Sequence, residues 1–268
     1  MRVPAEPWVR EHVHRAADPV TPKHAATIAV VRDGHDGLEV FLMRRTTSMA
    51  FAAGMYVFPG GGVHDEDRRQ VSWIGPDASA FAERFHIEAE LAHALVVAAV
   101  RETFEETGVL LAGNSEGDIV SDASVFHDAR LALERHELTF AEFLQSEQLS
   151  LRADLLGAWS HWITPAYEPR RYDTKFFVAA LPDGQRIDTV SSEADDSAWL
   201  PIAHVLNSVD LGEVAMMPPT VHTCRQLSQL RAHELLDAAS RRRIQTIEPV
   251  LIEEAGELFI DTGDTDFS

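Results

Sequence analysis

The chain is poor in cysteine, in long apolar runs and in basic residues, and each shortage argues against a class of protein. Cys224 is the only cysteine among 268 residues, so no disulfide can form within one chain and a reducing compartment is expected. No stretch of about 18 apolar residues and no apolar N-terminal segment is present, which argues against a membrane span or a secretion signal. We therefore expect a cytoplasmic protein that binds no membrane.

The shortage of basic residues bears on the partners of the chain. Lys and Arg total 23 against 43 Asp and Glu, and the net charge is −20. Such a chain repels the phosphate backbone of nucleic acid, so we expect no nucleic-acid partner. An anionic small molecule stays possible, because metal ions and a few arginines can hold one.

Two further catalytic patterns are weak in this sequence. None of the 13 histidines lies in an H-E-x-x-H pair, so a zinc site on one helix is not expected. Residues 113–117 match the G-x-S-x-G pattern of serine hydrolases, but that pattern needs a helix directly after it, and polar Asp118 follows instead. A flexible loop is the better interpretation of this segment.

Strand and helix patterns alternate along the chain, which is typical of an α/β fold. Residues 1–23 read as an irregular N-terminal arm, and 24–268 as a single domain with helical additions at 122–148 and 219–242 that could form a homodimer contact. Gly108 stands where a helix C-terminus requires a left-handed residue. The predicted strands are 25–31, 38–43, 55–58, 109–111, 159–163, 175–181, 197–200, 247–252 and 257–260, and the predicted helices are 78–86, 88–107, two within 122–148, 202–209 and 219–242.

The richest chemical signal is an acidic face on the predicted helix 88–107. Glu102, Glu105 and Glu106 are spaced i, i+3 and i+4, so their carboxylates share one side of the helix and repel one another. A bound divalent cation, which prefers oxygen ligands, would relieve this repulsion. Arg101 precedes Glu105 by four residues and can orient a carboxylate. The alternative is an ordinary solvated helix face.

This helix and a glycine loop upstream of it resemble the Nudix hydrolase family, whose box reads G-x5-E-x7-R-E-U-x-E-E-x-G-U, where U is bulky and apolar. Residues 101–109 match its second half, with Thr103 in place of an aliphatic residue, and Gly61 with Asp67 matches its first half, with Asp in place of Glu. Gly60 with Glu66 is the other possible register. The family pattern has 7 residues between Asp67 and Arg101 and this chain has 33, so residues 68–93 are an insertion.

The resemblance implies a Nudix fold, in which a mixed β-sheet is sandwiched between helices. It also implies a bound Mg²⁺ or Mn²⁺ that assists hydrolysis of a small-molecule diphosphate at its P–O–P bridge. The implied metal ligands are the carbonyl of Gly61 and the carboxylates of Glu102, Glu105 and Glu106. The implied catalytic residues are Arg101, Glu102, Glu105, Glu106 and, from an acidic loop, Glu193 as ligand or general base; a merely solvated loop is the alternative there.

A second set of features is similar to the coenzyme A diphosphatases of that family, including a peroxisomal-type branch with a long insertion in the box. Residues 45–46, Gly54 and 58–61 follow the spacing of a coenzyme A diphosphatase motif, with Ala50 where that motif has a second Arg. The later segments 162–165, 170–174 and 217–219 resemble the peroxisomal-type branch. The residues at 266–268 lack a peroxisomal signal, which favours the cytoplasm. The resemblance implies coenzyme A or an acyl-coenzyme A as substrate; NADH, a nucleotide sugar or a catalytically silent nucleotide-binding module are the alternatives. The candidate phosphate-binding groups are Arg44, Arg45, Arg170 and Arg171, unless they are surface counter-charges.

Overall fold

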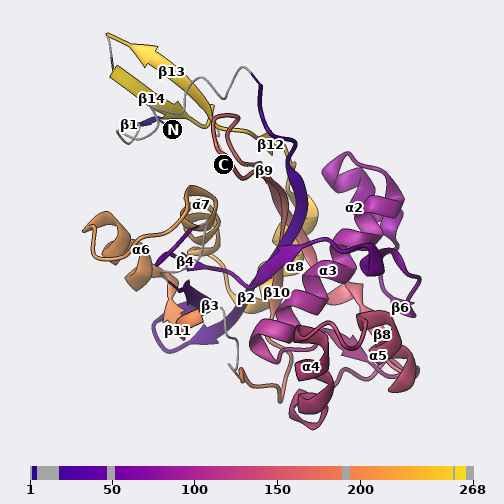
Figure 1. Cartoon of the computed structure of the whole chain (residues 1–268). Coiled ribbons are helices and arrows are strands. Elements are labelled where there is room, and N and C mark those ends of the chain that lie inside the picture. The colour runs from indigo at the N-terminus through magenta and orange to yellow at the C-terminus, as the bar shows by residue number, and fades with distance from the viewer. Residues whose placement is uncertain (1, 5–17, 47–51, 189–193, 256, 264–268) are drawn as a thin grey trace.

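The computed structural model describes residues 2–4, 18–46, 52–188, 194–255 and 257–263, and within these ranges eight strands form one mixed sheet (Figure 1). β10 runs parallel to β2, and β12 parallel to β9, whereas the remaining pairs are antiparallel. The main path is β11 (Ala194–Pro201), β3 (Gly37–Arg45), β2 (Lys23–Gly34), β10 (Tyr172–Ala180), β9 (Gly157–Ile163) and β12 (Thr246–Ile247), while β4 (Tyr56–Val57) pairs with β3 and β5 (Gly60–Gly62) with β2. The predicted mixed sheet is confirmed.

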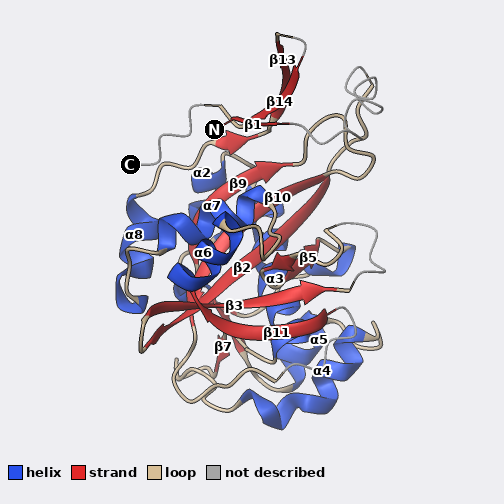
Figure 2. Cartoon of the chain, turned by 90° about the vertical axis from the view of Figure 1, so that its left-hand side faces the viewer, coloured by secondary structure: helices blue, strands red, loops and turns tan. Residues whose placement is uncertain are grey.

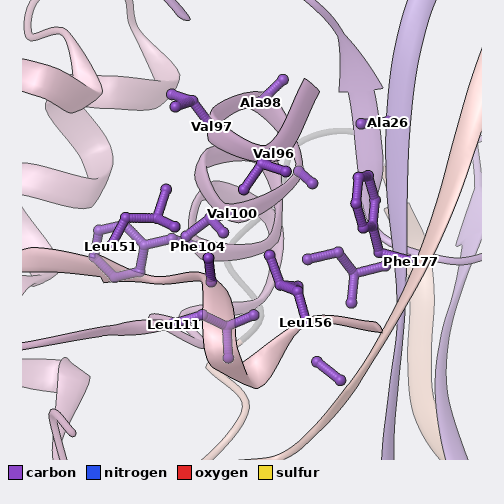
Figure 3. Packing of buried hydrophobic residues seen from close by; sticks show 14 of the residues in the cluster. Ala26, Val96, Val97, Ala98, Val100, Phe104, Leu111, Leu151, Leu156 and Phe177 are labelled. Atoms are coloured by element: carbon purple, nitrogen blue, oxygen red, sulfur yellow. The ribbon is translucent and has the colours of Figure 1, made fainter. Parts of the chain in front are cut away.

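Helices cover both faces of this sheet, as the Nudix resemblance implies (Figure 2). α2 (Ala78–Phe85) and α3 (Ala89–Thr107) pack on one face, and α6 (Ile202–Asp210), α7 (Pro218–Leu227) and α8 (Leu235–Arg241) pack on the other. Val96, Val100 and Phe104 of α3 belong to the core cluster on the first of these faces, which also contains Phe177 of β10 (Figure 3). Burial of each large apolar side chain in this way contributes about 1.5–3 kcal/mol to the stability of the fold.

The apolar run at 94–100 explains why α3 lies at the centre of the molecule. A helix that is apolar on most of its circumference needs partners on most sides, and α3 finds them in β2, α2 and a pair of helices on its outer side. These are α4 (His127–Glu134) and α5 (Phe140–Ser146), preceded by the 3₁₀ turn η3 (Ala123–Phe126). The two helices predicted within 122–148 are therefore confirmed; a dimer contact through them stays a prediction.

Two helix ends follow the predicted local chemistry. α3 ends at Gly108, which has a φ of 75° and donates its N–H to Phe104. Because a left-handed residue closes the helix at little cost only when it is glycine, this position explains the stop. α5 begins at a capping box in which Thr139 and Glu142 satisfy each other's backbone N–H groups.

Two small sheets flank the main one. One contains β6 (Trp73–Ile74), β8 (Ser150–Arg152) and β7 (Ala112–Gly113), and the other contains β1 (Arg2–Pro4), β14 (Glu257–Asp261) and β13 (Val250–Glu254). The second sheet stands at one end of the molecule (Figure 2). Short 3₁₀ turns complete the fold: η2 (Asp65–Arg68), η4 (Ala153–Leu155) and η5 (Ala232–Glu234).

The structure differs from the sequence prediction in several places. Residues 109–111 are buried but form no strand; they lead into β7. The predicted helix 219–242 is two helices, α7 and α8, separated by a turn at 228–231 and by η5. The predicted strand 247–252 is divided at Pro249, which cannot donate to a β-ladder, so that β12 joins the main sheet and β13 the small one. The arm expected to be irregular contributes β1, paired with β14.

The main sheet divides between β2 and β3. These strands pair only from Val31–Val40 to Gly34–Gly37, next to their connecting turn. Farther along, β2 pairs with β5 and β3 with β4, so the glycine run that was predicted as a loop is a short strand. The diverging ends of both strands, residues 25–27 of β2 and Arg45 of β3, line the cleft described below.

A buried charged row crosses the sheet on neighbouring strands. Lys175 is fully buried and donates to Asp173, and its Nζ lies 3.0 Å from Nε2 of His161. Burial alone would raise the pKa of Asp173, but hydrogen bonds from His161 and Lys175 hold that pKa well below its ordinary value.

Within the described ranges, no helix is long and apolar enough to cross a membrane.

Candidate active site

The last two turns of α3 bring the four predicted box residues against β5. Glu105 and Glu106 are only 8% and 7% exposed, and Arg101 is 5% exposed. A solvated helix face would leave such side chains in water, so that interpretation of the acidic face is wrong. The interior of a protein takes up charges like these only when they are paired or bind an ion.

Arg101 is the internal cation of the acidic cluster. Its Nε and one terminal nitrogen hold the two carboxylate oxygens of Asp67 at 2.8 and 3.0 Å, and its other terminal nitrogen lies 2.8 Å from Glu102 and 3.4 Å from Glu105. A further bond of 3.1 Å reaches the carbonyl of Gly62. This fork geometry is specific to a guanidinium. Arg101 therefore joins η2, β5 and the acidic face of α3.

The contacts of Arg101 decide the register of the first half of the box. Asp67 is 2% exposed and receives the bidentate bond, whereas Glu66, its neighbour in η2, is exposed. Gly61 with Asp67 is thus the register that the fold supports. Asp67 also accepts the backbone N–H of His64 at 2.8 Å, so it fixes the turn after the glycine strand.

Burial changes the protonation chemistry of this cluster. It raises the pKa of the Glu105 carboxyl to about 7, against the lowering influence of Arg101, and the charge of Glu102 adds to the increase. Burial alone would lower the pKa of Arg101, but its bond to Asp67 and the surrounding carboxylates hold it above its ordinary value. Arg101 therefore stays charged, while Glu105 can exchange a proton near neutral pH.

The glycine strand β5 needs glycine because the acidic helix lies directly over it. A Cβ on Gly61 would overlap the Glu102 carboxylate, and a Cβ on Gly60 would overlap the backbone of β2. The N–H of Gly60 donates to Glu106 at 2.7 Å. Backbone and carboxylates therefore meet without an intervening side chain, which is the close approach that a metal ion held by both requires.

This geometry revises the predicted carbonyl ligand. In an extended strand the N–H and C=O of one residue point to the same side, and successive residues alternate. Gly60 donates to α3 and Gly62 accepts from it, so Gly61, which pairs with Ala26, has its polar groups toward β2. The carbonyl of Gly60, rather than that of Gly61, faces the carboxylates.

A cleft of about 760 Å³ opens beside the acidic helix. Five carboxylates line it, and the guanidinium of Arg45 is the single Lys or Arg side chain that the described residues contribute to its wall. The wall continues away from α3 over apolar and aromatic side chains, and the segments singled out at 162–165 and 217–219 lie there together. The carboxylates are Glu102, Glu105, Glu106, Glu134 and Glu168.

The four predicted phosphate-binding arginines have different positions. Arg45 lines the cleft. Arg44 and Arg170 are exposed outside it. Arg171 is buried and bonds to Glu248 and to the carbonyls of Thr164 and Val20, so its guanidinium is committed to joining segments of the fold. Glu193, the predicted ligand or base, lies outside the described residues.

The structure also shows what becomes of the G-x-S-x-G segment and of the possible metal ligands. The segment 113–117 is a turn whose ends are joined by the Gly113–Ile119 bridge, and no helix follows it, so it is not a nucleophile elbow. Within the described residues, no three His, Cys, Asp or Glu side chains already converge as a metal-binding group. At the acidic face, Glu102 and Glu105 are turned toward Arg101 and Glu106 toward Gly60.

Sequence reasoning missed two histidines of the site. His64, just before η2, and His136, just after α4, both line the cleft, and both also line a second cavity of about 350 Å³. Their ring centroids are 5.4 Å apart. No spacing rule connects positions so distant in the chain, so no local signal could have found this pair.

Known proteins show which class this fold and site define. The sequence model described as the NUDT19 Nudix domain matches residues 76–227, which is more than half of the chain, and the chain belongs to this family of Nudix hydrolases. A solved structure, the NUDIX hydrolase from Alicyclobacillus acidocaldarius, superposes with a TM-score of 0.67 at 26% identity, covering 84% of this chain and 99% of that one. The predicted family and fold are confirmed.

Curated relatives bear the same family names. Putative nudix hydrolase 7 of Caenorhabditis elegans is 30% identical over 236 residues, which are 82% of this chain and 66% of that protein. The acyl-coenzyme A diphosphatase NUDT19 of Xenopus laevis is 24% identical, over 70% of this chain and 59% of the relative, and that of Homo sapiens is 25% identical, over 72% and 61%. The chain thus spans between 59% and 66% of the length of these relatives.

Proposed function

We propose that this chain is a divalent-metal-dependent hydrolase that cleaves the diphosphate bridge of a nucleoside diphosphate derivative, with coenzyme A or an acyl-coenzyme A as the preferred substrate. The charge of the cleft carries the proposal. Five carboxylates face one guanidinium among the described residues, and such a cleft repels a diphosphate unless cations lie between them. Carboxylates with a backbone carbonyl are the oxygen ligands that Mg²⁺ and Mn²⁺ accept.

The residues of α3 and β5 fit such a metal ion. Glu102, Glu105 and Glu106, with the carbonyl of Gly60, would hold it, and a bound ion would supply Lewis-acid polarisation of the phosphate and activation of water. Arg101 keeps Glu102 and Glu105 in place through its bonds to Asp67 and to both carboxylates. Burial raises the pKa of Glu105 to about 7, so binding of a divalent ion by this carboxylate would release a proton near neutral pH.

The shape of the cleft and the names of the relatives support the choice of substrate. A coenzyme A molecule has a diphosphate at its middle and, on one side, a long arm in which alkyl groups alternate with two amides. The cleft likewise has its carboxylates at one end and continues over Phe58, Trp162, Phe176 and Pro218. Arg45 lines the same cleft, and its guanidinium would bind a phosphate oxygen of the substrate. Two relatives are named acyl-coenzyme A diphosphatases. The cytoplasmic location belongs to the same proposal, because Cys224 is the only cysteine and no disulfide can form within the chain.

The decisive experiment is turnover by the purified chain with Mg²⁺ or Mn²⁺. Coenzyme A should be cleaved to 3′,5′-ADP and 4′-phosphopantetheine, detected by chromatography, and chelation of the metal should stop the reaction. NADH and nucleotide sugars belong to the same panel. Preference for one of them would redirect the substrate choice, and tight binding without cleavage of any diphosphate would favour a silent nucleotide-binding module.

A matched pair of variants on α3 tests the acidic face itself. Glu106→Gln should lower the rate at least about 100-fold, because a charge that stabilises the reacting centre is lost while the carbonyl oxygen of Gln can still accept from Gly60. Glu90→Gln makes the same change at the exposed start of the helix and should leave the rate unchanged. A fully active Glu106→Gln would rule out the proposed site.

A further inference from the structure

Two histidines from distant parts of the chain meet beside the acidic cluster. His64 and His136 are exposed, their ring centroids lie 5.4 Å apart, and the ring planes are inclined at 74°. The cleft and the second cavity share both residues, and the third residue that they share is Glu105. The pair therefore stands at the junction of the two cavities.

We propose that His64 and His136 bind a transition-metal ion of the Zn²⁺ class at this junction, in addition to the Mg²⁺ or Mn²⁺ of the carboxylates. A zinc ion lies about 2.0–2.1 Å from each imidazole nitrogen, and near-tetrahedral ligation separates the two ring centroids by about 5 Å. The observed 5.4 Å matches this separation. Because both rings are exposed, each can turn to present a nitrogen to a shared ion at little cost.

The backbone holds both residues at this spacing before any ion binds. The N–H of His64 donates to Asp67, and the two bonds of Asp67 to Arg101 fix that carboxylate in turn. His136 has a left-handed backbone with a φ of 57°, and its N–H donates to Leu133 at 2.8 Å. Histidine is among the non-glycine residues that adopt this conformation most readily, so the turn after α4 fixes where the His136 side chain leaves the backbone.

The two proposed metal ions differ in the ligands that they prefer. Imidazole suits Zn²⁺, Ni²⁺ and Cu²⁺, whereas carboxylate and carbonyl oxygens suit Mg²⁺ and Mn²⁺. The negative charge of the cleft raises the local concentration of any cation at its mouth. With two protein ligands the ion keeps open positions for water or phosphate oxygens. This proposal goes beyond the hydrolase proposal and does not depend on it.

Calorimetric titration of Zn²⁺ into the full chain, under saturating Mg²⁺ to occupy the carboxylates, tests the site. His64→Asn and His136→Asn remove one imidazole each, and Asn is tolerated both before a helix and in a left-handed turn, so the fold should survive. His35→Asn is the control, because His35 lies in the exposed turn between β2 and β3, outside both cavities. Wild type and His35→Asn should bind one more Zn²⁺ than either site variant, or bind it at least ten-fold more tightly.

Co²⁺ provides a second readout, since its visible absorption reports nitrogen ligation. The intense bands of a low-coordinate, imidazole-bound ion should appear with wild type and His35→Asn and be lost in both site variants. Equal Zn²⁺ stoichiometry and affinity in all four proteins would overturn the proposal. Because the measurement is binding, that outcome is distinct from a failure to cleave coenzyme A.

Discussion

Removing the guanidinium of Arg101 should be among the most damaging single changes outside the apolar core. Arg101→Met keeps the stem of the side chain but leaves Asp67, 2% exposed, and the buried Glu105 without their cation. Breaking a buried ion pair from one side costs about 3–5 kcal/mol, because the remaining charge stays desolvated. Since a domain has about 5–15 kcal/mol of stability in all, we expect a melting temperature lower by about 10 °C.

The assay is urea-induced unfolding followed by circular dichroism, with a chelator present so that metal binding does not contribute to the free energy. Arg225→Met on α7 is the matched control, because Arg225 pairs with Asp210 at 3.0 Å in an exposed ion pair. Such pairs contribute about 0–1 kcal/mol. The two substitutions have the same chemistry and differ in burial.

A double-mutant cycle identifies the cause of the stability loss in Arg101→Met. If the unpaired charge of Asp67 is the origin, Asp67→Asn introduced into Arg101→Met should recover a large part of the stability, and the two single losses should not add. Additive losses, or an Arg101→Met variant no less stable than Arg225→Met, would refute the reasoning.

Three further changes test other parts of the structure. Gly61→Ala should lower hydrolysis because its Cβ would displace the Glu102 carboxylate, with little loss in thermal unfolding since a flexible side-chain end can shift; Gly62→Ala, with no foreign atom closer than 4.0 Å, should be tolerated in both thermal unfolding and turnover. Acidification should destabilise the wild type as the pH falls below about 3.8, because the folded-state pKa of Asp173 is depressed and its stabilisation exists only above the unfolded value; Asp173→Asn should show a weaker decline in the same acid titration. Arg84→Ala should cost about 1–3 kcal/mol in urea unfolding, since Arg84 binds three carbonyls at the end of α8.

Local features of the fold followed from the sequence wherever the cause is itself local. The sequence pattern predicted the helix 88–107, and Gly108 predicted its end, because helix periodicity and backbone conformation depend on neighbours within a few residues. The clustering of Glu102, Glu105 and Glu106 followed from the same periodicity. The predicted continuous strand 247–252 was wrong: Pro249 divides it, and which sheet each half joins depends on segments far away in the chain.

Only the tertiary structure decided how the site is assembled. The choice of Asp67 over Glu66 and of the Gly60 carbonyl over that of Gly61 depends on how β5 pairs with β2 and packs beneath α3. The use of Arg171 within the fold depends on how the segments that contain Val20, Thr164 and Glu248 meet. The meeting of His64 with His136 depends on the same packing. Sequence alone determined which carboxylates share a face, because helix geometry is a short-range property. What opposes that face was determined by strand register and packing between distant segments, which no short-range rule contains.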